Sequence, residues 1–295
     1  MATVQDLRRR IRSVRNTRKI TKAMELVASA RLRRAQARIE AMRPYADRMM
    51  EMMIGTARAA SMRGLPLLER REVGTVAILP LTGDRGLAGG FNAQILRHAF
   101  ALNRSLTADG MTVHWLVSGR KGASTLRFRG FKAHQAWTGF SDRPSYGDAQ
   151  AIAHRLAELY TSQEIDRAVV VYNHFVSPLV QKVVEQDVLP IPLGTLESSD
   201  EEQKLSAELV DVIYEPEPRT ILARLLPFYL ETEIYRALLE SAASEQGARM
   251  TAMRNASKNA GELIDSLTLA MNRARQAEIT QEILEVVAGA DALTQ

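Results

Sequence analysis

The chain has 295 residues, of which 46% are hydrophobic, 25% charged and 5% aromatic, values that exclude the disordered class. It contains no cysteine, which excludes disulfides, thiolate catalysis and cysteine-based metal sites and favours a reducing compartment. The net charge of +5 is concentrated in residues 1–43, where thirteen Lys and Arg oppose three acidic residues, so this segment carries +10 and the remainder −5.

Hydropathy gives no sign of a membrane-spanning element. No apolar run approaches the roughly 18 residues that a transmembrane helix needs, and the N-terminus lacks the apolar core of a secretory signal peptide. We therefore expect no transmembrane segment and interpret the chain as soluble or peripherally attached.

Apolar residues recur every three or four positions along the N-terminal segment, which predicts an amphipathic helix over residues 4–43. Pro44 is expected to kink this helix without ending it, because four methionines between residues 49 and 53 resume the pattern to about residue 60. We attribute these methionines to an irregular packing seam rather than to a metal or ligand site. The predicted stripe consists of Val4, Leu7, Ile11, Val14, Ile20, Met24, Val27, Ala35, Ile39 and Met42.

Short apolar runs alternate with helical patterns in the middle of the chain, which predicts one domain over residues 74–205. This alternation is typical of a doubly wound, largely parallel sheet covered by helices. The acidic, serine-rich segment 197–202 is expected to close the domain as a surface linker. Strands are predicted at 73–81, 111–117, 166–176 and 180–193, and helices at 91–106, 119–129 and 145–161.

A second long helical pattern begins after Pro216 and Pro218 and gives a predicted segment of residues 211–290, with an early bend at Pro227. At ~1.5 Å per residue the two terminal helices reach roughly 80 and 105 Å, too far for one compact domain to bury. The sequence therefore predicts an α/β protein in which the N-terminal helix, residues 1–60, and the C-terminal helix form a long antiparallel coiled coil. A central, doubly wound Rossmann-like α/β domain lies between them in the sequence. Its C-terminal seam is read as Ala256, Ala260, Leu263, Leu267, Ala270, Ala274 and Ala277.

The glycine-rich segment 82–90 follows the first predicted strand, where doubly wound sheets often bind phosphate. Its glycines fit neither G-x-G-x-x-G nor G-x-x-x-x-G-K-S/T, and no acidic residue follows at the distance of a ribose partner. Asp84 and Arg85 more simply form a loop ion pair or contact a neighbouring protein. A nucleotide-binding α/β enzyme remains an alternative that this spacing disfavours.

Histidines show no arrangement suited to catalysis or metal binding, because the five are scattered singly (His98, His114, His134, His154 and His174). We predict no catalytic, cofactor-binding or metal-binding residues. The arginine-rich N-terminal helix allows a basic coiled coil that binds nucleic acid, or simply a solvated face. Its cations alternate with the apolar stripe and no stacking aromatics accompany them, so a cationic surface for acidic protein loops fits better.

Three segments, in the same order, resemble the gamma subunit of rotary F-type ATP synthases. Residues 7–25 read LRRRIRSVRNTRKITKAME, residues 84–92 read DRGLAGGFN, and residues 274–290 read ARQAEITQEILEVVAGA. The middle segment is similar to the family's D-R-G-L-C-G-G-L-N, with Ala88 in place of the cysteine. A cysteine-bearing insertion for redox control is also missing, so that form of regulation is not expected.

The resemblance implies a central stalk whose coiled coil enters a ring of alpha and beta subunits, with the middle domain against the epsilon subunit and the proton-driven membrane ring. It implies no cofactor, no nucleic-acid partner and no catalysis by the chain itself, since ATP chemistry belongs to beta. The implied location is peripheral, on the cytoplasmic face of a bacterial cell membrane. The implied contacts with the alpha/beta ring are Met24, Arg249, Arg275, Gln276, Thr280 and Glu282.

Overall fold

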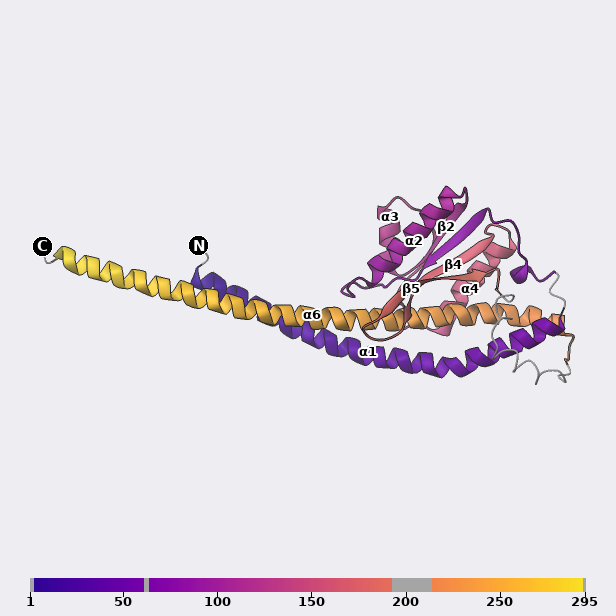
Figure 1. The fold of residues 1–295 in the computed structure, drawn as a ribbon, viewed down its shortest axis with the longest axis horizontal. Coiled ribbons are helices and arrows are strands. Elements are labelled where there is room, and N and C mark those ends of the chain that lie inside the picture. Colours follow the sequence, from indigo (N-terminus) through magenta and orange to yellow (C-terminus); the bar gives the residue numbers. More distant parts are fainter. Residues whose placement is uncertain (1–2, 61–63, 193–213, 294–295) are drawn as a thin grey trace. The chain divides into compact units, whose positions relative to one another are not determined.

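The computed structural model describes residues 3–60, 64–192 and 214–293 (Figure 1). The chain divides into two compact units, a coil unit of Met1–Ala28 with Met250–Gln295 and a sheet unit of Ser29–Arg249. The two long helices, α1 (Val4–Ala59) and α6 (Pro218–Leu293), contribute residues to both units. The predicted linker 197–202 lies outside the described residues.

The sheet unit is built on a five-stranded sheet with the order β3-β2-β1-β4-β5. Strand β1 pairs in parallel with β2 and β4, β2 pairs in parallel with β3, and β5 is antiparallel to β4. The prediction of a doubly wound, largely parallel sheet is therefore confirmed. The strands are β1 (Thr75–Pro80), β2 (Thr112–Ser118), β3 (Ala133–Trp137), β4 (Arg167–Phe175) and β5 (Gln181–Leu189).

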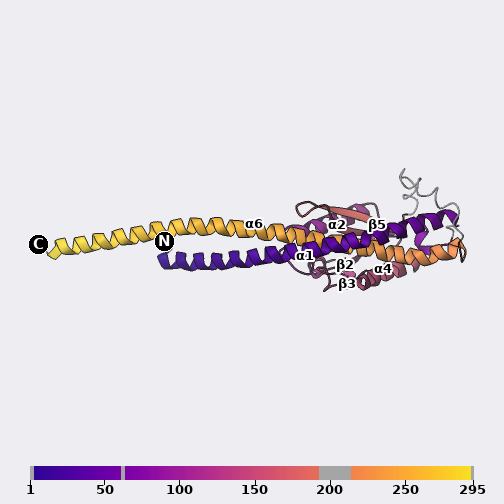
Figure 2. The same cartoon turned by 90° about the horizontal axis from the view of Figure 1, so that it is seen from below.

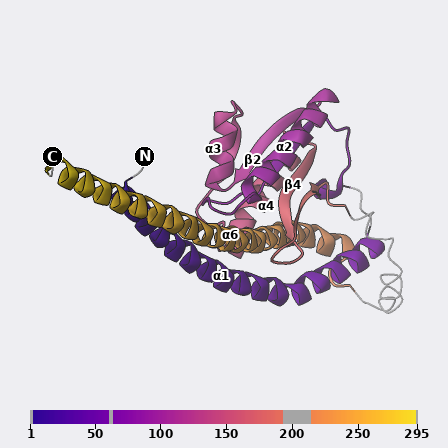
Figure 3. The same cartoon turned by 60° about the vertical axis from the view of Figure 1, so that its left-hand side comes forward.

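Helices cover both faces of the sheet (Figures 1 and 3). On one face α2 (Phe91–Ala108) and α3 (Arg120–Phe128) pack on alternate residues of β1 and β2. On the other face α4 (Tyr146–Thr161), the short 3-10 helix η1 (Pro66–Leu68) and α6 form a second core with the remaining inward residues. Two layers of helix thus bury both faces of the sheet, which explains why its central strands read as continuous apolar runs.

The prolines do not end either long helix. Within the sheet unit α1 continues through Pro44, and Met49 and Met53 beyond it are buried in the core with α6. Helix α6 likewise continues through Pro227. The prediction that the N-terminal helix extends past Pro44 is confirmed. Met49, Met50 and Met53 pack in the core as expected, whereas Met52 is 53% exposed.

In the coil unit the two helices run side by side in opposite directions (Figure 2). Arg254 donates a hydrogen bond to Glu25 at 3.1 Å, and a Cβ on Gly261 would lie 3.7 Å from the guanidinium of Arg18. Moving seven residues toward the N-terminus of α1, from Glu25 to Arg18, therefore corresponds to moving seven residues toward the C-terminus of α6, from Arg254 to Gly261. This register confirms the predicted antiparallel coiled coil.

The residues predicted for the α1 seam are only partly correct. Leu7 and Ile11 are buried, but Ile20 and Val27 are 60% and 53% exposed and face outward. Thr21 and Glu25 take the buried positions of that stretch instead. Glu25 can lie there because Lys22 and Arg254 both donate to its carboxylate, which also lowers its pKa.

The predicted α6 seam is displaced by one residue in its middle. Ala260 is buried as expected, but Leu263 is 46% exposed, whereas the adjacent Ile264 is buried and only 8% exposed. The heptad chosen from the sequence followed alanines and leucines, which occur on both faces of this helix. Burial shows that Met250, Met253, Ala260 and Ile264 form the seam, so the assignment of Leu263 was wrong.

No helix among the residues that the structure describes is long and apolar enough to cross a membrane.

Candidate functional site

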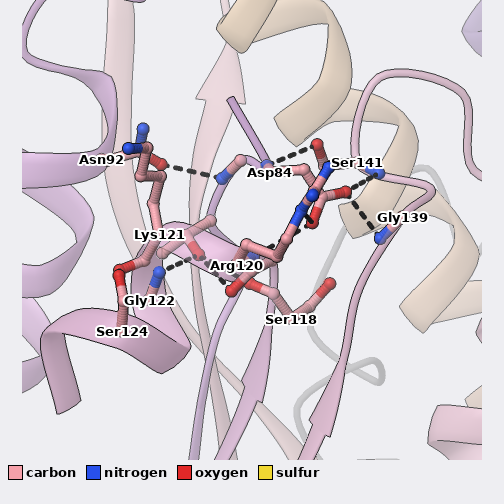
Figure 4. A network of polar contacts seen from close by, with 12 residues as sticks. Asp84, Asn92, Ser118, Arg120, Lys121, Gly122, Ser124, Gly139 and Ser141 are labelled. Carbon is pink, nitrogen blue, oxygen red and sulfur yellow. Dashed lines mark hydrogen bonds and ion pairs between the residues drawn. The ribbon is translucent and has the colours of Figure 1, made fainter. Parts of the chain in front are cut away.

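The glycine-rich loop that joins β1 to α2 is held in place by a network of hydrogen bonds (Figure 4). The Asp84 carboxylate accepts hydrogen bonds from the backbone N–H groups of Arg120 (3.0 Å), Gly139 (2.8 Å) and Ser141 (3.1 Å). The Gly83 N–H donates to the side chain of Asn92 at 2.8 Å. These bonds tie the loop to the β2–α3 turn and to the turn that follows β3.

Asp84 is an anion at neutral pH. Burial by itself raises the pKa of this carboxyl, but the backbone donors of Ser141, Arg120 and Gly139 outweigh that effect, and the pKa is lowered. The guanidinium of Arg120 lies 3.6 Å away. Backbone N–H groups that could cradle a phosphate are thus already used by a carboxylate, which would repel one. This arrangement disfavours the nucleotide-binding alternative at the loop.

Thr82 joins the same loop to the N-terminus of α3. Its hydroxyl donates to the Ser118 carbonyl at 2.7 Å and accepts from the Gly122 N–H at 2.9 Å. The chain approaches Thr82 so closely because Gly119 and Gly122 have no side chains. The glycines around this loop therefore serve packing between neighbouring turns.

We expect Asp84→Asn to destabilise the chain by about 2–3 kcal/mol at neutral pH, because three N–H groups lose an anionic acceptor. The folded pKa lies below the ordinary 3.8, so the stabilisation is complete above the ordinary value and is lost as pH falls through the folded pKa. Denaturant unfolding across pH should show the largest gap between variant and parent near neutrality. Asp109→Asn, at an exposed carboxylate after α2, is the control, and equal losses in both variants would contradict this role.

Helix α6 holds the other side of the loop through Arg249. Its guanidinium donates to Glu245 at 2.6 Å and to the Gly86 carbonyl at 3.3 Å, and its side chain is only 10% exposed. Burial raises the pKa of the Glu245 carboxyl, while Arg249 acts in the opposite direction. The Glu245 side chain also lies directly over Gly83. Of the six predicted ring contacts, Arg249 is thus the one already engaged inside the sheet unit.

The coil unit presents an apolar stripe on the outer face of α1. Ile20 and Val27 are exposed and Met24 is half-buried between them, at the spacing of one helix face. Beside the stripe runs a groove of about 680 Å³ in which Glu25 is the one acidic lining residue. The cations that line this groove are Arg15, Arg18, Lys19, Lys22, Arg254 and Lys258.

The C-terminal part of α6 extends past the start of α1 (Figures 1 and 2). Four predicted contacts lie on it with exposed side chains: Arg275, Gln276, Thr280 and Glu282. The same stretch exposes five large apolar residues, which sequence reasoning did not single out. They are Ile279 (47%), Ile283 (57%), Leu284 (63%), Val286 (72%) and Val287 (51%). The sequence could have indicated these residues, because the predicted C-terminal helix is longer than the N-terminal one and still contains large apolar residues in the part that the N-terminal helix cannot cover.

Comparisons with known proteins agree on one family. The family profile ATP-synt, described as ATP synthase, matches residues 3–293. A curated protein named ATP synthase gamma chain from Rubrobacter xylanophilus is 47% identical over 294 residues, covering 99% of both chains. One of the same name from Nostoc punctiforme is 42% identical over 315 positions that cover all of both chains, so it has residues that this chain lacks.

Solved structures share the fold. A chain from the central stalk and c-ring of the Tetrahymena thermophila mitochondrial ATP synthase is 27% identical with a TM-score of 0.58, covering 81% of this chain and 99% of that one. A chain from the Euglena gracilis mitochondrial ATP synthase has a TM-score of 0.69 at 16% identity, covering 98% of this chain and 94% of that one.

Proposed function

This chain belongs to the ATP synthase gamma-chain family, and from that premise we propose that it is the central rotor stalk of an F-type ATP synthase. It couples transmembrane proton flow to ATP synthesis or hydrolysis at the beta subunits by rotating inside the alpha/beta ring. The observation that carries this proposal is the outward apolar surface of the coil unit. A helix pair that buries Thr21 and Glu25 while exposing Ile20 and Val27 is suited to an enclosing partner.

The proposed contacts with the ring are of two kinds. Met24 and its neighbours on α1 offer an apolar stripe beside a cationic groove, which fits acidic loops of beta. The exposed residues Arg275, Gln276, Thr280 and Glu282 lie on the unpaired end of α6, together with large apolar side chains that fit a hydrophobic bore. Arg249 acts indirectly in this scheme, by holding the loop at Gly86 against α6.

The remaining partners and the location that we propose are those that the resemblance implied. The sheet unit contacts the epsilon subunit and the proton-driven membrane ring, and the chain lies peripherally on the cytoplasmic face of a bacterial cell membrane. It binds no cofactor and performs no catalysis alone. Each angular position of the stalk favours a different conformation of beta, and the differential contact free energy changes nucleotide affinity there.

Magnitudes require that many contacts transmit torque. One charge crossing the membrane supplies ~2.3 kcal/mol per 100 mV, and several crossings accumulate for each ATP. An exposed ion pair contributes only ~0.2–1 kcal/mol. Steric and ionic contacts along the coil unit therefore share the load, and no single residue transmits it.

The direct test is rotation. Because the chain has no cysteine, Ser105→Cys on an exposed position of α2 provides a single labelling site for a bead. In a complex with alpha and beta fixed to a surface, ATP should drive stepwise rotation of the bead in one direction. A complex that hydrolyses ATP while the bead stays fixed would refute the rotor function.

Met24→Lys is expected to lower the efficiency of ATP-driven proton pumping with near-normal assembly. The new cation would stand beside acidic loops of beta, and an extra pair of about 0.2–1 kcal/mol must be broken at each step. The measurement is proton pumping relative to ATP hydrolysis in reconstituted membranes. Thr107→Lys adds the same charge at an exposed position of α2, in the sheet unit, and should leave the ratio unchanged. Equal ratios in both variants would place Met24 away from the torque-bearing surface.

A further inference from the structure

A basic groove lies between α3 and the start of β3, on the sheet unit. It has a volume of about 530 Å³, and Arg120, Arg127 and Lys132 line its rim. Lys121 and Arg129 lie on the same segment, and all five cations are exposed. No Asp or Glu occurs anywhere between residues 110 and 141. The groove is therefore a concentrated positive surface, although residues 44–295 together carry a net negative charge.

Most of this charge is not neutralised within the sheet unit. Arg120 lies near Asp84, and Arg129 stacks over the ring of Phe100 at 5.3 Å. Among the residues that the structure describes, no ion pair involves Lys121, Arg127 or Lys132. Like charges held together without a partner raise the free energy of the isolated chain, and an acidic partner would relieve that repulsion.

The groove also has an apolar component. Its floor contains Ala123, Phe131 and Ala133, all half-buried. Phe128, at the end of α3 between two arginines, is 89% exposed, more than any other large apolar residue in the part of the chain that the structure describes. An apolar floor with a cationic rim matches a peptide that carries carboxylates on both sides of a large apolar side chain. A nucleic acid or an anionic lipid surface would engage the cations and the exposed Phe128, but neither carries a side chain to cover the half-buried floor, so a peptide is favoured.

The groove adjoins the glycine-rich loop at Arg120, which lies 3.6 Å from Asp84. Figure 4 shows Arg120 and Lys121 beside that loop, and a Cβ on Gly86 would lie 3.7 Å from the Lys121 Cε. Leu87 exposes 64% of its surface at the loop's tip with a φ of 65°, a conformation that β-carbon sterics disfavour. Exposed apolar and cationic side chains therefore occur both in the loop and at the neighbouring start of α3.

We propose that the α3 groove binds an acidic segment of a neighbouring protein subunit, a loop or helix end with carboxylates flanking one large apolar residue. Arg127 and Lys132 pair with the carboxylates, and the apolar residue lies on Phe131. This inference rests on the proposed function only for the source of the segment, which is a subunit of the same complex.

Carbodiimide cross-linking of the assembled complex tests this, because the reagent joins lysine amines to carboxylates that already touch them. Peptide mass spectrometry should find Lys121 and Lys132 joined to Asp or Glu within one short segment of another subunit. Arg127→Glu should lower the yield of those cross-links about fivefold, because it replaces an attraction at the rim by a repulsion. Arg97→Glu makes the same change at an exposed position of α2 and should leave the yield unchanged.

Three results would overturn the proposal. The first is an intact complex in which other lysines of the chain react but Lys121 and Lys132 join no other subunit. The second is an equal yield in the Arg127→Glu and Arg97→Glu variants. The third is binding of the full chain to phosphatidylglycerol vesicles or to single-stranded DNA that Arg127→Glu alone abolishes, which would assign the groove to a phosphate polyanion. Failure of the rotor function is distinguishable, since it is measured by the bead assay, whereas the cross-links are identified by peptide mass spectrometry and do not require rotation.

Discussion

Ile264→Asp is expected to unfold much of the coil unit, whereas Leu263→Asp is expected to leave it folded. In a unit of two helices only the partner helix can bury a residue, so the 8% exposure of Ile264 places it on the seam with α1. Its neighbour Leu263 is 46% exposed. Burying an unpaired carboxylate and losing the apolar contacts of isoleucine costs about 3–4 kcal/mol, whereas a surface change stays within about 0.5 kcal/mol.

The two variants control for each other. Both place the same charge within three residues of Gly261, which lies beside Arg18, so long-range attraction acts on both. Only burial differs. Far-ultraviolet circular dichroism and thermal unfolding of the full chain should show lost helix and a lower Tm for Ile264→Asp alone. Matching melting curves for the two variants would show that the seam is assigned to the wrong face.

The architecture could be predicted because its signals are long and periodic. The central strands β1 and β4 are buried on both faces, so they read as continuous apolar runs, and each helix between the strands repeats at three to four residues. Strand β3 was not predicted, for a physical reason. At the edge of the sheet its five residues alternate between half-buried and exposed, and a strand this short needs no apolar run.

The seam register could not be derived with the same certainty. A helix that contacts its own chain on one face and another protein on a second face has two apolar stripes, and periodicity alone does not rank them. In α1 the polar stripe through Thr21 and Glu25 is the intramolecular one, which inverts the usual rule. That choice depends on Arg254, which is more than two hundred residues away along the chain and pairs with Glu25.

For the glycine-rich loop, too, some features could be predicted from the sequence and others could not. Its position after the first strand and its departure from phosphate-binding spacing could be seen in the sequence. The partners of Asp84 could not, since a neighbouring arginine was expected and the structure instead brings N–H groups from Arg120, Gly139 and Ser141. Contacts between turns that follow different strands depend on the finished sheet, not on local pattern.

Gly119→Ala is expected to destabilise the sheet unit by at least about 4 kcal/mol, which belongs to the severe class of single substitutions. A Cβ at this position would lie 2.1 Å from the Thr82 carbonyl oxygen and 2.5 Å from its carbon. Neither segment can move aside at low cost. The Thr82 N–H donates to the Ser118 carbonyl at 2.8 Å, and the Gly119 N–H donates to the Trp137 carbonyl at 2.8 Å.

Gly130→Ala is the control that distinguishes the steric clash at Gly119 from the backbone strain of an alanine with a positive φ. Gly119 and Gly130 both have a positive φ, 95° and 80°, but nothing lies within 4 Å of a Cβ on Gly130. The control should therefore lose only the strain of a left-handed alanine, about 1–2 kcal/mol. Denaturant unfolding of both full-length variants measures the difference, and soluble yield serves where Gly119→Ala fails to fold. If Gly119→Ala were no less stable than Gly130→Ala, the close approach of the β2–α3 turn to Thr82, and with it the tethering of the glycine-rich loop, would be wrong.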